Sequence, residues 1–347
     1  MIFSDKILHW YALNKRELPW RNTVNPYNIW LSEIMLQQTR VAQGTPYYLK
    51  FIENFPTIKD LADASEEKIL KLWQGLGYYS RARNLHATAK MVINSYNGEF
   101  PNTYKELLKL KGVGDYTASA IASISFNLPE AVVDGNVNRV LSRYFGVDIP
   151  INSTEGIKYF KKLAQEVMNV EQIRDYNQGI MEFGAIQCVP KNPNCNVCPL
   201  KDSCVALNDD KVDSLPIKIK KTKVRKRYFN YLVIVDEANK TILQQRTGKG
   251  IWQNLYEFPL LETEKDTIIK DEQINKLLSE LSINAKSFKK YQFNEQKIVH
   301  KLSHQHLYTT FYIVNVNNEI ANGVSVSEIS KFPVPVLIAD FIKMFKI

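Results

Sequence analysis

Apolar residues recur every three or four positions through most of the first 205 residues of the chain. This spacing places them on one face of a helix and the polar residues on the other. The pattern is clearest over residues 4–14, 57–74, 81–96 and 153–168. Stretches that contain proline, with Ser, Thr or Asn available as helix caps, interrupt it at residues 25–28, 54–56, 98–103 and 148–154. The pattern therefore predicts a nearly all-helical domain.

From Tyr228 the apolar residues form short runs that are typical of strands. "YLVIV" is followed by a turn at "DEANK" and by "TILQQR", and "HLYTTFYIVNV" comes later. Before them, "KIKKTKVRKR" at 218–227 has seven basic residues in ten, which suits both a solvated linker and a clamp on phosphates. We predict a helical domain at 1–206, a basic linker at 207–227 and a smaller α+β domain at 228–347.

Composition and charge fit a globular protein with a polyanionic partner. The chain has 347 residues, of which 45% are hydrophobic, and this is enough for the cores of two domains. Its net charge of +9 favours a polyanion, although solvated lysine faces would also account for it. No run of 18 apolar residues occurs, and "MIFSDKILHW" lacks the apolar core of a signal peptide. We therefore expect a cytoplasmic protein with no membrane partner.

All four cysteines of the chain lie within seventeen residues, at Cys188, Cys195, Cys198 and Cys204. In the cytosol such a cluster more often binds metal or does redox chemistry than forms disulfides. Four thiolates can hold one zinc ion or one 4Fe-4S cluster, and unrelated buried cysteines are the remaining alternative. The C-x6-C-x2-C-x5-C spacing resembles the iron–sulfur loop of the endonuclease III and adenine glycosylase superfamily. That resemblance implies a 4Fe-4S cofactor.

Two glycines flank an apolar residue in Gly112-Val113-Gly114, between two predicted helices. Such glycines let backbone amides approach a phosphate at a helix N-terminus, although an ordinary helix–helix turn has the same pattern. The segment resembles the helix-hairpin-helix of the same superfamily, whose members often carry Pro where this chain has Lys111. Bifunctional relatives place a Schiff-base lysine two residues after the second glycine. This chain has Tyr116 there, which implies hydrolysis without strand cleavage.

Two carboxyl groups suit the cleavage of a glycosidic bond. Glu33 shares a predicted helical face with Ile29, Trp30 and Leu36, and these apolar neighbours would raise its pKa so that it can act as an acid. A glutamate favoured by the helix dipole is the simpler interpretation. Asp134 is a candidate N-cap, and backbone N–H donors would lower its pKa and keep it ionised. One protonated and one ionised carboxyl is the pair that glycosidic cleavage requires.

Six blocks of the sequence resemble, in order, those of adenine DNA glycosylases of the MutY type. They are "LPWR", "SEIMLQQTRV", "GLGYYSRARNLH", "GVGDYTA", "VVDGNVNRV" and "YNQGIMEFGA". The resemblance covers essentially all of residues 16–204. It implies base excision repair, in which adenine mispaired with 8-oxoguanine or guanine is removed from double-stranded DNA. The adenine would first be flipped out of the stack, at a cost of about a few kcal/mol that a mispair reduces.

The resemblance also implies roles for individual residues. Glu33 would protonate adenine N7 and later handle the proton of the attacking water. Asp134 would stabilise the oxocarbenium ion, assisted by Asn136 and Tyr116. The implied DNA contacts are Arg21 and Gln178 at the adenine, Leu36, Gln38, Thr39 and Tyr78 in the gap on the 8-oxoguanine strand, and Gly112 and Gly114 at a phosphate. We expect a monomer associated with the nucleoid.

The stretch "GIWQNLYEFP" at 250–259 resembles the opening of the Nudix-type domain that is appended to these glycosylases. A working Nudix hydrolase would need a Mg-binding helix of the form R-E-x-x-E-E, which the following residues lack. We therefore expect a Nudix-like lesion-recognition domain. The family's Phe-Ser-His loop is matched by Leu302, Ser303 and His304, so Ser303 would contact the 8-oxo/N7–H edge and His304 a phosphate. Ordinary strand-loop residues are the alternative.

Two other functions fit part of the sequence. An endonuclease III-type glycosylase/lyase that acts on pyrimidine lesions shares the cysteine loop and the hairpin, but Tyr116 and the C-terminal domain argue against it. A non-catalytic, metal-stapled DNA-binding protein would leave Glu33, Asp134 and Tyr116 together unexplained.

Overall fold

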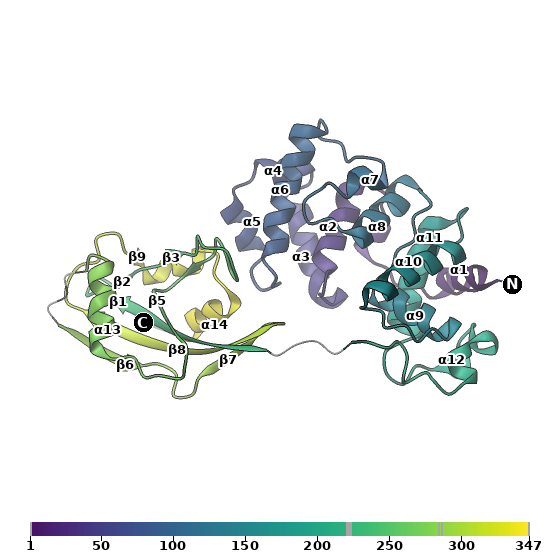
Figure 1. The fold of residues 1–347 in the computed structure, drawn as a ribbon. Coiled ribbons are helices and arrows are strands. Elements are labelled where there is room, and N and C mark those ends of the chain that lie inside the picture. Colours follow the sequence, from purple (N-terminus) through teal and green to yellow (C-terminus); the bar gives the residue numbers. More distant parts are fainter. Residues whose placement is uncertain (1, 220–223, 284, 286, 346–347) are drawn as a thin grey trace. The chain divides into compact units, whose positions relative to one another are not determined.

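The computed structural model describes residues 2–219, 224–283, 285 and 287–345. The chain forms two compact units (Figure 1). The first consists of residues 1–64 and 83–220, and the second of residues 65–82 and 221–347. Residues 220–223 of the predicted basic linker lie outside the described part of the chain. The predicted domain boundaries remain predictions.

The first unit is built of helices, as predicted (Figure 1). They are α1 (Phe3–Asn14), η1 (Pro19–Arg21), α2 (Pro26–Leu36), α3 (Val41–Asn54), α4 (Ile58–Asp63), α6 (Ser80–Ser95, whose first residues belong to the second unit), α7 (Tyr104–Leu107), α8 (Asp115–Phe126), α9 (Gly135–Phe145), α10 (Thr154–Val167), α11 (Ile173–Glu182), the π-helix η2 (Phe183–Gln187), η3 (Cys195–Val197), η4 (Lys201–Ser203) and α12 (Val205–Asn208).

The amphipathic stretch at 57–74 forms two helices rather than one. α4 ends before Ala64, whose backbone is extended, and α5 (Glu66–Leu72) starts again after Ser65. The Ser65 hydroxyl accepts a hydrogen bond from the Lys68 N–H at 3.2 Å and so caps the second helix. A side chain that can cap a helix therefore breaks a periodic pattern that, by itself, would continue.

Three helices of the first unit pack around α11. It packs against α1, α8 and α9, while α2 packs against α8. Gly179 permits the close approach of α11 to α1, because a Cβ atom at this position would lie only 3.1 Å from Cβ of Tyr11. Trp30 of α2 is completely buried in the core of the unit. This packing brings one end of α2, α8, α9 and α11 to a common pocket.

The second unit contains a mixed seven-stranded sheet with the order β6-β8-β1-β2-β9, in which β5 also pairs with β1 and β7 with β8. Its strands are β1 (Arg225–Val235), β2 (Lys240–Thr241), β5 (Leu260–Thr263), β6 (Phe288–Gln292), β7 (Ile298–Lys301), β8 (Gln305–Val316) and β9 (Val324–Ser325), while β3 (Gln244–Gln245) and β4 (Tyr256–Glu257) form a separate pair. β1 and β8 run parallel, with Arg225 opposite Gln305. The predicted strand at 241–246 is thus divided between β2 and β3.

Helices cover both faces of this sheet (Figure 1). Ile274 and Leu278 of α13 (Asp271–Glu280) pack with Leu232 of β1 on one face. On the other, Phe341 of α14 (Val336–Met344) stacks on Phe311 of β8 with ring centroids 4.1 Å apart. The 3-10 helix η5 (Val326–Lys331) precedes α14. Within the described ranges, no helix combines the length and the apolar character that crossing a membrane requires.

Candidate active site

Glu33 projects from α2, a helix in which every residue from Ile29 to Met35 is buried. The helix starts at Pro26 because Asn25 caps it, its side-chain oxygen accepting the Tyr27 N–H at 2.9 Å. Glu33 is itself only 8% exposed. Its pKa is raised from 4.5 to about 7, mainly by burial and also by the nearby Asp134, against the opposing effects of the Tyr116 hydrogen bond and of Arg21. The predicted direction is confirmed.

Asp134 is the N-cap of α9, as predicted. Its Oδ1 accepts the backbone N–H groups of Asn136 at 2.8 Å and of Val137 at 2.7 Å. Its Oδ2 accepts the Nδ2–H of Asn136 at 2.8 Å. The expectation of a lowered pKa is wrong, because burial raises the pKa of Asp134 more than these hydrogen bonds lower it.

Tyr116 enters the same region from the first turn of α8. Its hydroxyl is within hydrogen-bonding reach of the Glu33 carboxyl and lies 3.2 Å from Sδ of Met181. Burial, together with the nearby carboxyl groups of Glu33 and Asp134, raises the pKa of the phenol well above 10. The phenol is therefore a neutral hydrogen-bonding group next to both carboxyls.

These side chains surround a cavity of about 190 Å³. It is small compared with the roughly 300–1,000 Å³ of sites for drug-sized ligands, and so suits one small group. Eight predicted site residues line it, namely Arg21, Glu33, Leu36, Thr39, Tyr116, Asp134, Asn136 and Gln178. Gln38 is exposed and does not line the cavity, and its backbone is left-handed, with φ of 56°. The structure thus brings together side chains that are widely spaced in the sequence.

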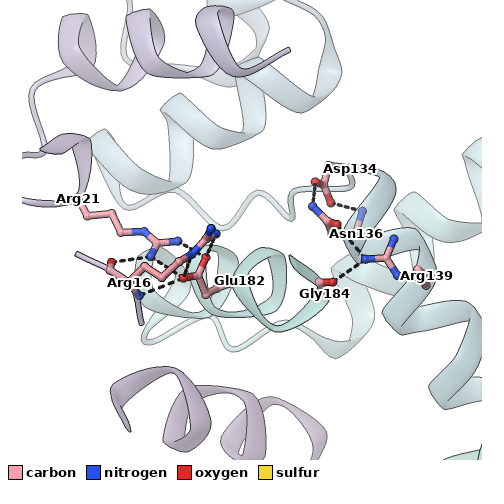
Figure 2. A network of polar contacts seen from close by, with 7 residues as sticks. All are labelled: Arg16, Arg21, Asp134, Asn136, Arg139, Glu182 and Gly184. Atoms are coloured by element: carbon pink, nitrogen blue, oxygen red, sulfur yellow. Dashed lines mark hydrogen bonds and ion pairs between the residues drawn. The ribbon is translucent and has the colours of Figure 1, made fainter. Parts of the chain in front are cut away.

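Sequence reasoning missed Glu182, a further carboxyl of this cavity. It stands at the end of α11, one turn after Gln178, and its side chain is 1% exposed. Arg16 and Arg21 both pair with it, with shortest distances of 2.6 and 2.8 Å (Figure 2). The spacing of four residues from a predicted pocket residue on a helix could have indicated it.

A second missed group is Arg139 of α9. Its Nη2 donates to Oδ1 of Asn136 at 2.9 Å and to the carbonyl of Gly184 (Figure 2). Its Nε donates to the carbonyl of Cys188 at 2.7 Å. Gly184 allows this approach, because a Cβ atom there would lie 2.6 Å from Cβ of Asn136. Asp134, Asn136 and Arg139 therefore form one hydrogen-bonded row that ends at the start of the cysteine loop.

The cysteine loop is held by Arg143, another buried arginine of α9. It donates to the carbonyl groups of Val189 at 2.8 Å and Pro190 at 3.0 Å, and its Nη1 lies 3.5 Å from Sγ of Cys188. Burial, with a smaller contribution from the other three cysteines, raises the pKa of the Cys198 thiol to about 11. Four soft thiol donors near one another, with a guanidinium beside them, fit an iron–sulfur cluster. Across the described residues, no three metal-ligating side chains form a group that could hold a single metal ion.

The glycine turn lies before α8. Gly112 has φ of 79°, and a Cβ atom there would lie 2.9 Å from Cβ of Asn84, so the position requires glycine on both counts. Gly114 is the N-cap of α8 and has no atom within 4 Å of an added Cβ. Lys111 is exposed beside them, while Thr88 donates to its carbonyl at 2.8 Å. The turn offers an open backbone surface at a helix N-terminus.

Tyr78, Ser303 and His304 lie in the second unit. The Tyr78 hydroxyl is 2.5 Å from Oγ of Ser303, although the two residues are 225 positions apart. Tyr78 is 47% exposed with φ of 48°, and the Arg81 guanidinium lies 5.6 Å from its ring centre. Ser303 and His304 are exposed in the turn between β7 and β8, closed by the Leu302 N–H on the Gln305 carbonyl at 2.8 Å. The structure thus joins two regions that the sequence predicted separately.

Comparison with known proteins gives two family matches. Residues 31–156 match the HhH-GPD superfamily of base excision DNA repair proteins, and residues 230–344 match the NUDIX domain. These matches confirm the predicted fold of both parts.

Individual proteins agree with the family matches. A curated adenine DNA glycosylase of Buchnera aphidicola subsp. Baizongia pistaciae is 38% identical over 309 residues, which cover 89% of this chain and 84% of the relative. A solved thermostable thymine-DNA glycosylase aligns with a TM-score of 0.56 and 34% identity, over 60% of this chain and 95% of that one. A non-covalent endonuclease III–DNA complex aligns with a TM-score of 0.52 and 25% identity, over 60% and 94%.

Proposed function

Since this chain belongs to the adenine DNA glycosylases, enzymes of base excision repair, we propose that it hydrolyses the glycosidic bond of adenine mispaired with 8-oxoguanine or guanine in duplex DNA. The observation that carries this proposal is that Glu33, Asp134 and Tyr116 line one small pocket in which no lysine is found among the described lining residues.

Glu33 is the proposed acid. With a pKa of about 7 it holds its proton in a large fraction of molecules at neutral pH, whereas an ordinary glutamate would not. Donation of this proton to N7 of the flipped adenine makes the base a neutral leaving group. The Tyr116 hydroxyl can donate to the carboxylate that is left, which then takes a proton from the attacking water.

Asp134 is the proposed stabiliser of the oxocarbenium ion. Every hydrogen bond that its carboxyl makes with Asn136 and Val137 is accepted from an N–H donor, so both oxygens are used as a carboxylate uses them. A negative charge that is fixed in place before the reaction stabilises the positive charge that develops on the sugar. Asn136 and Arg139 keep that carboxylate in one orientation.

The reaction should end with an intact strand. A lyase needs an amine that attacks C1′ and forms an imine, and Tyr116 has none. Lys161 of α10 is held by contacts of its own: its Nζ donates to Ser119 Oγ and to the Ala131 carbonyl, both at 2.8 Å, and pairs with Asp115. These contacts engage Lys161 outside the pocket.

DNA would be gripped at the glycine turn of Gly112 and Gly114, with a phosphate at the N-terminus of α8. Leu36, Gln38, Thr39 and Tyr78 would occupy the space that the flipped base leaves. Ser303 and His304 would read the 8-oxoguanine. The hydrogen bond between Tyr78 and Ser303 supports a shared task for Tyr78, in the space that the base leaves, and for the loop of Ser303 and His304, at the 8-oxoguanine. With chromosomal DNA as substrate, we expect a monomer on the nucleoid.

The four thiolates of Cys188, Cys195, Cys198 and Cys204 would hold a 4Fe-4S cluster. When bound, the cluster would supply covalent cross-links across the loop rather than a step of the hydrolysis. Arg143 would place a positive charge beside it. Arg139 and Arg143 attach this loop to the helix whose N-cap is Asp134.

A glycosylase assay tests the proposal directly. Duplexes with 8-oxoguanine:A, G:A, a T:G mispair or an oxidised pyrimidine are incubated with excess protein, and strands are analysed with and without alkali. We expect adenine loss from the first two, visible as strand breaks only after alkali. Release of thymine or of an oxidised pyrimidine in place of adenine would favour the endonuclease III-type alternative. Binding without any base release would favour a non-catalytic DNA-binding protein.

A further inference from the structure

Glu182 has no role in the reaction described so far, although it lines the same pocket. Its Oε1 accepts hydrogen bonds from Arg16 Nε at 2.7 Å and Arg21 Nη1 at 3.1 Å. Its Oε2 accepts from Arg16 Nη2 at 2.6 Å and Arg21 Nη2 at 2.8 Å, and the Arg16 backbone N–H adds a bond of 3.0 Å (Figure 2). Burial alone would raise its pKa, but the two arginines lower it to about 2. Glu182 is therefore ionised under all working conditions.

Glu182 reduces the positive charge that two arginines place near Glu33. The charged groups of the pocket are the guanidinium ions of Arg16 and Arg21 and the carboxyls of Glu33, Asp134 and Glu182, and the Tyr116 phenol is neutral. Arg139 favours the ionised form of Asp134, and Glu182 offsets one of the two guanidinium charges of Arg16 and Arg21. Without Glu182, an uncompensated guanidinium would favour the ionised form of Glu33, as Arg21 already does.

The elements around Glu33 each contribute one of these groups. Arg21 comes from η1, Tyr116 from α8, Asp134 from the cap of α9 and Glu182 from the end of α11. Arg21 Nη1 also donates to the carbonyl of Arg16 at 2.9 Å, so the two arginines and Glu182 form a closed network. Glu182 thus fixes the place of Arg21 and offsets part of the positive charge of the two arginines.

We propose that Glu182 is a positioning residue that holds Arg21 at the base pocket and, by offsetting part of the positive charge of Arg16 and Arg21, keeps the catalytic proton on Glu33 at neutral pH. This inference rests on the proposed function, in which Glu33 protonates adenine. A purely structural clamp between η1 and α11 would need the same contacts. It would slow the enzyme when broken, but it would not change the pH at which Glu33 loses its proton.

The test is the pH profile of single-turnover adenine release from an 8-oxoguanine:A duplex, between pH 5 and 9. It compares the wild type with Glu182→Gln, Arg16→Gln and the double variant. In Glu182→Gln, the fall in rate toward high pH should move to lower pH by roughly one unit, as one nearby charge produces. In Arg16→Gln it should move to higher pH. The double variant has the same net charge as the wild type, so its profile should return to the wild-type position even if its rate is lower.

Two results would overturn the inference. One is an unchanged profile in Glu182→Gln with rates reduced equally at every pH. The other is a double variant whose profile stays where that of Glu182→Gln lies. If Glu182→Gln does not fold, the shift of the pH profile in Arg16→Gln decides, because the Arg16 side chain is 37% exposed and tolerates replacement better. A wild type that releases no adenine refutes the proposed function instead. Normal release by the wild type, with the same pH profile in the wild type and all variants, refutes only the role of Glu182.

Discussion

Replacing Glu33 with glutamine should strongly slow adenine release and, above neutral pH, stabilise the folded protein. Burial is the main reason that the pKa of Glu33 rises from 4.5 to about 7. A difference of this size corresponds to about 3 kcal/mol between the two protonation states. The glutamate is 8% exposed, so solvent screens little of this free energy.

The direction of this change in stability follows from proton binding in the folded and unfolded states. Below pH 4.5 Glu33 is protonated in both. Between pH 4.5 and 7 the folded protein keeps a proton that the unfolded chain releases, so the free energy of unfolding falls as the pH rises. Glutamine cannot ionise. We therefore expect the variant and the wild type to be similar in stability near pH 4.5, and the variant to be more stable by about 3 kcal/mol at pH 8.

Urea unfolding at pH 5, 6, 7 and 8, followed by the circular dichroism of the helices, measures this difference. Single-turnover assays on the same preparations should show a loss of about 10²–10⁴ in the rate of adenine release, with DNA binding retained. Glu99→Gln changes an exposed glutamate of the same unit and serves as the matched control. A stability difference between Glu33→Gln and the wild type that is the same at pH 5 and pH 8, or near-normal release by the variant, would refute the reasoning.

Three further outcomes are expected. Borohydride should not trap the wild type efficiently on substrate DNA, since Tyr116 cannot form an imine; efficient trapping that a lysine variant abolishes would contradict this. Protein purified without oxygen should contain about four irons per chain and lose them when Cys198 is replaced by Ser, and stoichiometric zinc without iron would be the contrary result. Gly112→Ala should lower the free energy of unfolding by about 1–2 kcal/mol and weaken DNA binding, because Gly112 has φ of 79° and an added Cβ would meet Asn84. Gly114→Ala, where an added Cβ meets no atom, should change stability far less. Equal melting temperatures of the two variants would argue against this expectation.

Local sequence patterns were sufficient where the deciding interaction is also local. The apolar residues around Glu33 lie on its own helix, and the pKa of Glu33 is raised as they predicted. Asp134 caps the helix that directly follows it, again as predicted. Its pKa was predicted wrongly because the desolvation comes from the walls of the pocket, which other segments form.

The missed residues depend on contacts between distant segments. Glu182 pairs with an arginine that is 166 positions away, and Arg139 donates to a carbonyl 49 positions away. The spacing from Gln178 indicates the helical face of Glu182, but nothing in the sequence indicates the partner of either residue, since each pairing needs the packed helices to bring the partner close. Breaks such as Ser65 were missed because the apolar spacing continues on both sides of the cap.

Residues 65–82 form a compact unit with a part of the chain that is synthesised much later. Glu66 accepts a hydrogen bond from Asn254 at 2.5 Å, Lys71 donates to the carbonyl of Phe332 at 3.0 Å, and Tyr78 contacts Ser303. At the roughly 5–20 residues per second of ribosomal synthesis, this segment waits on the order of ten seconds or more for its partners. During translation the nascent chain therefore carries an unfinished loop at Tyr78, which reaches its final geometry only after the partners of this segment, as far as Phe332, have been synthesised.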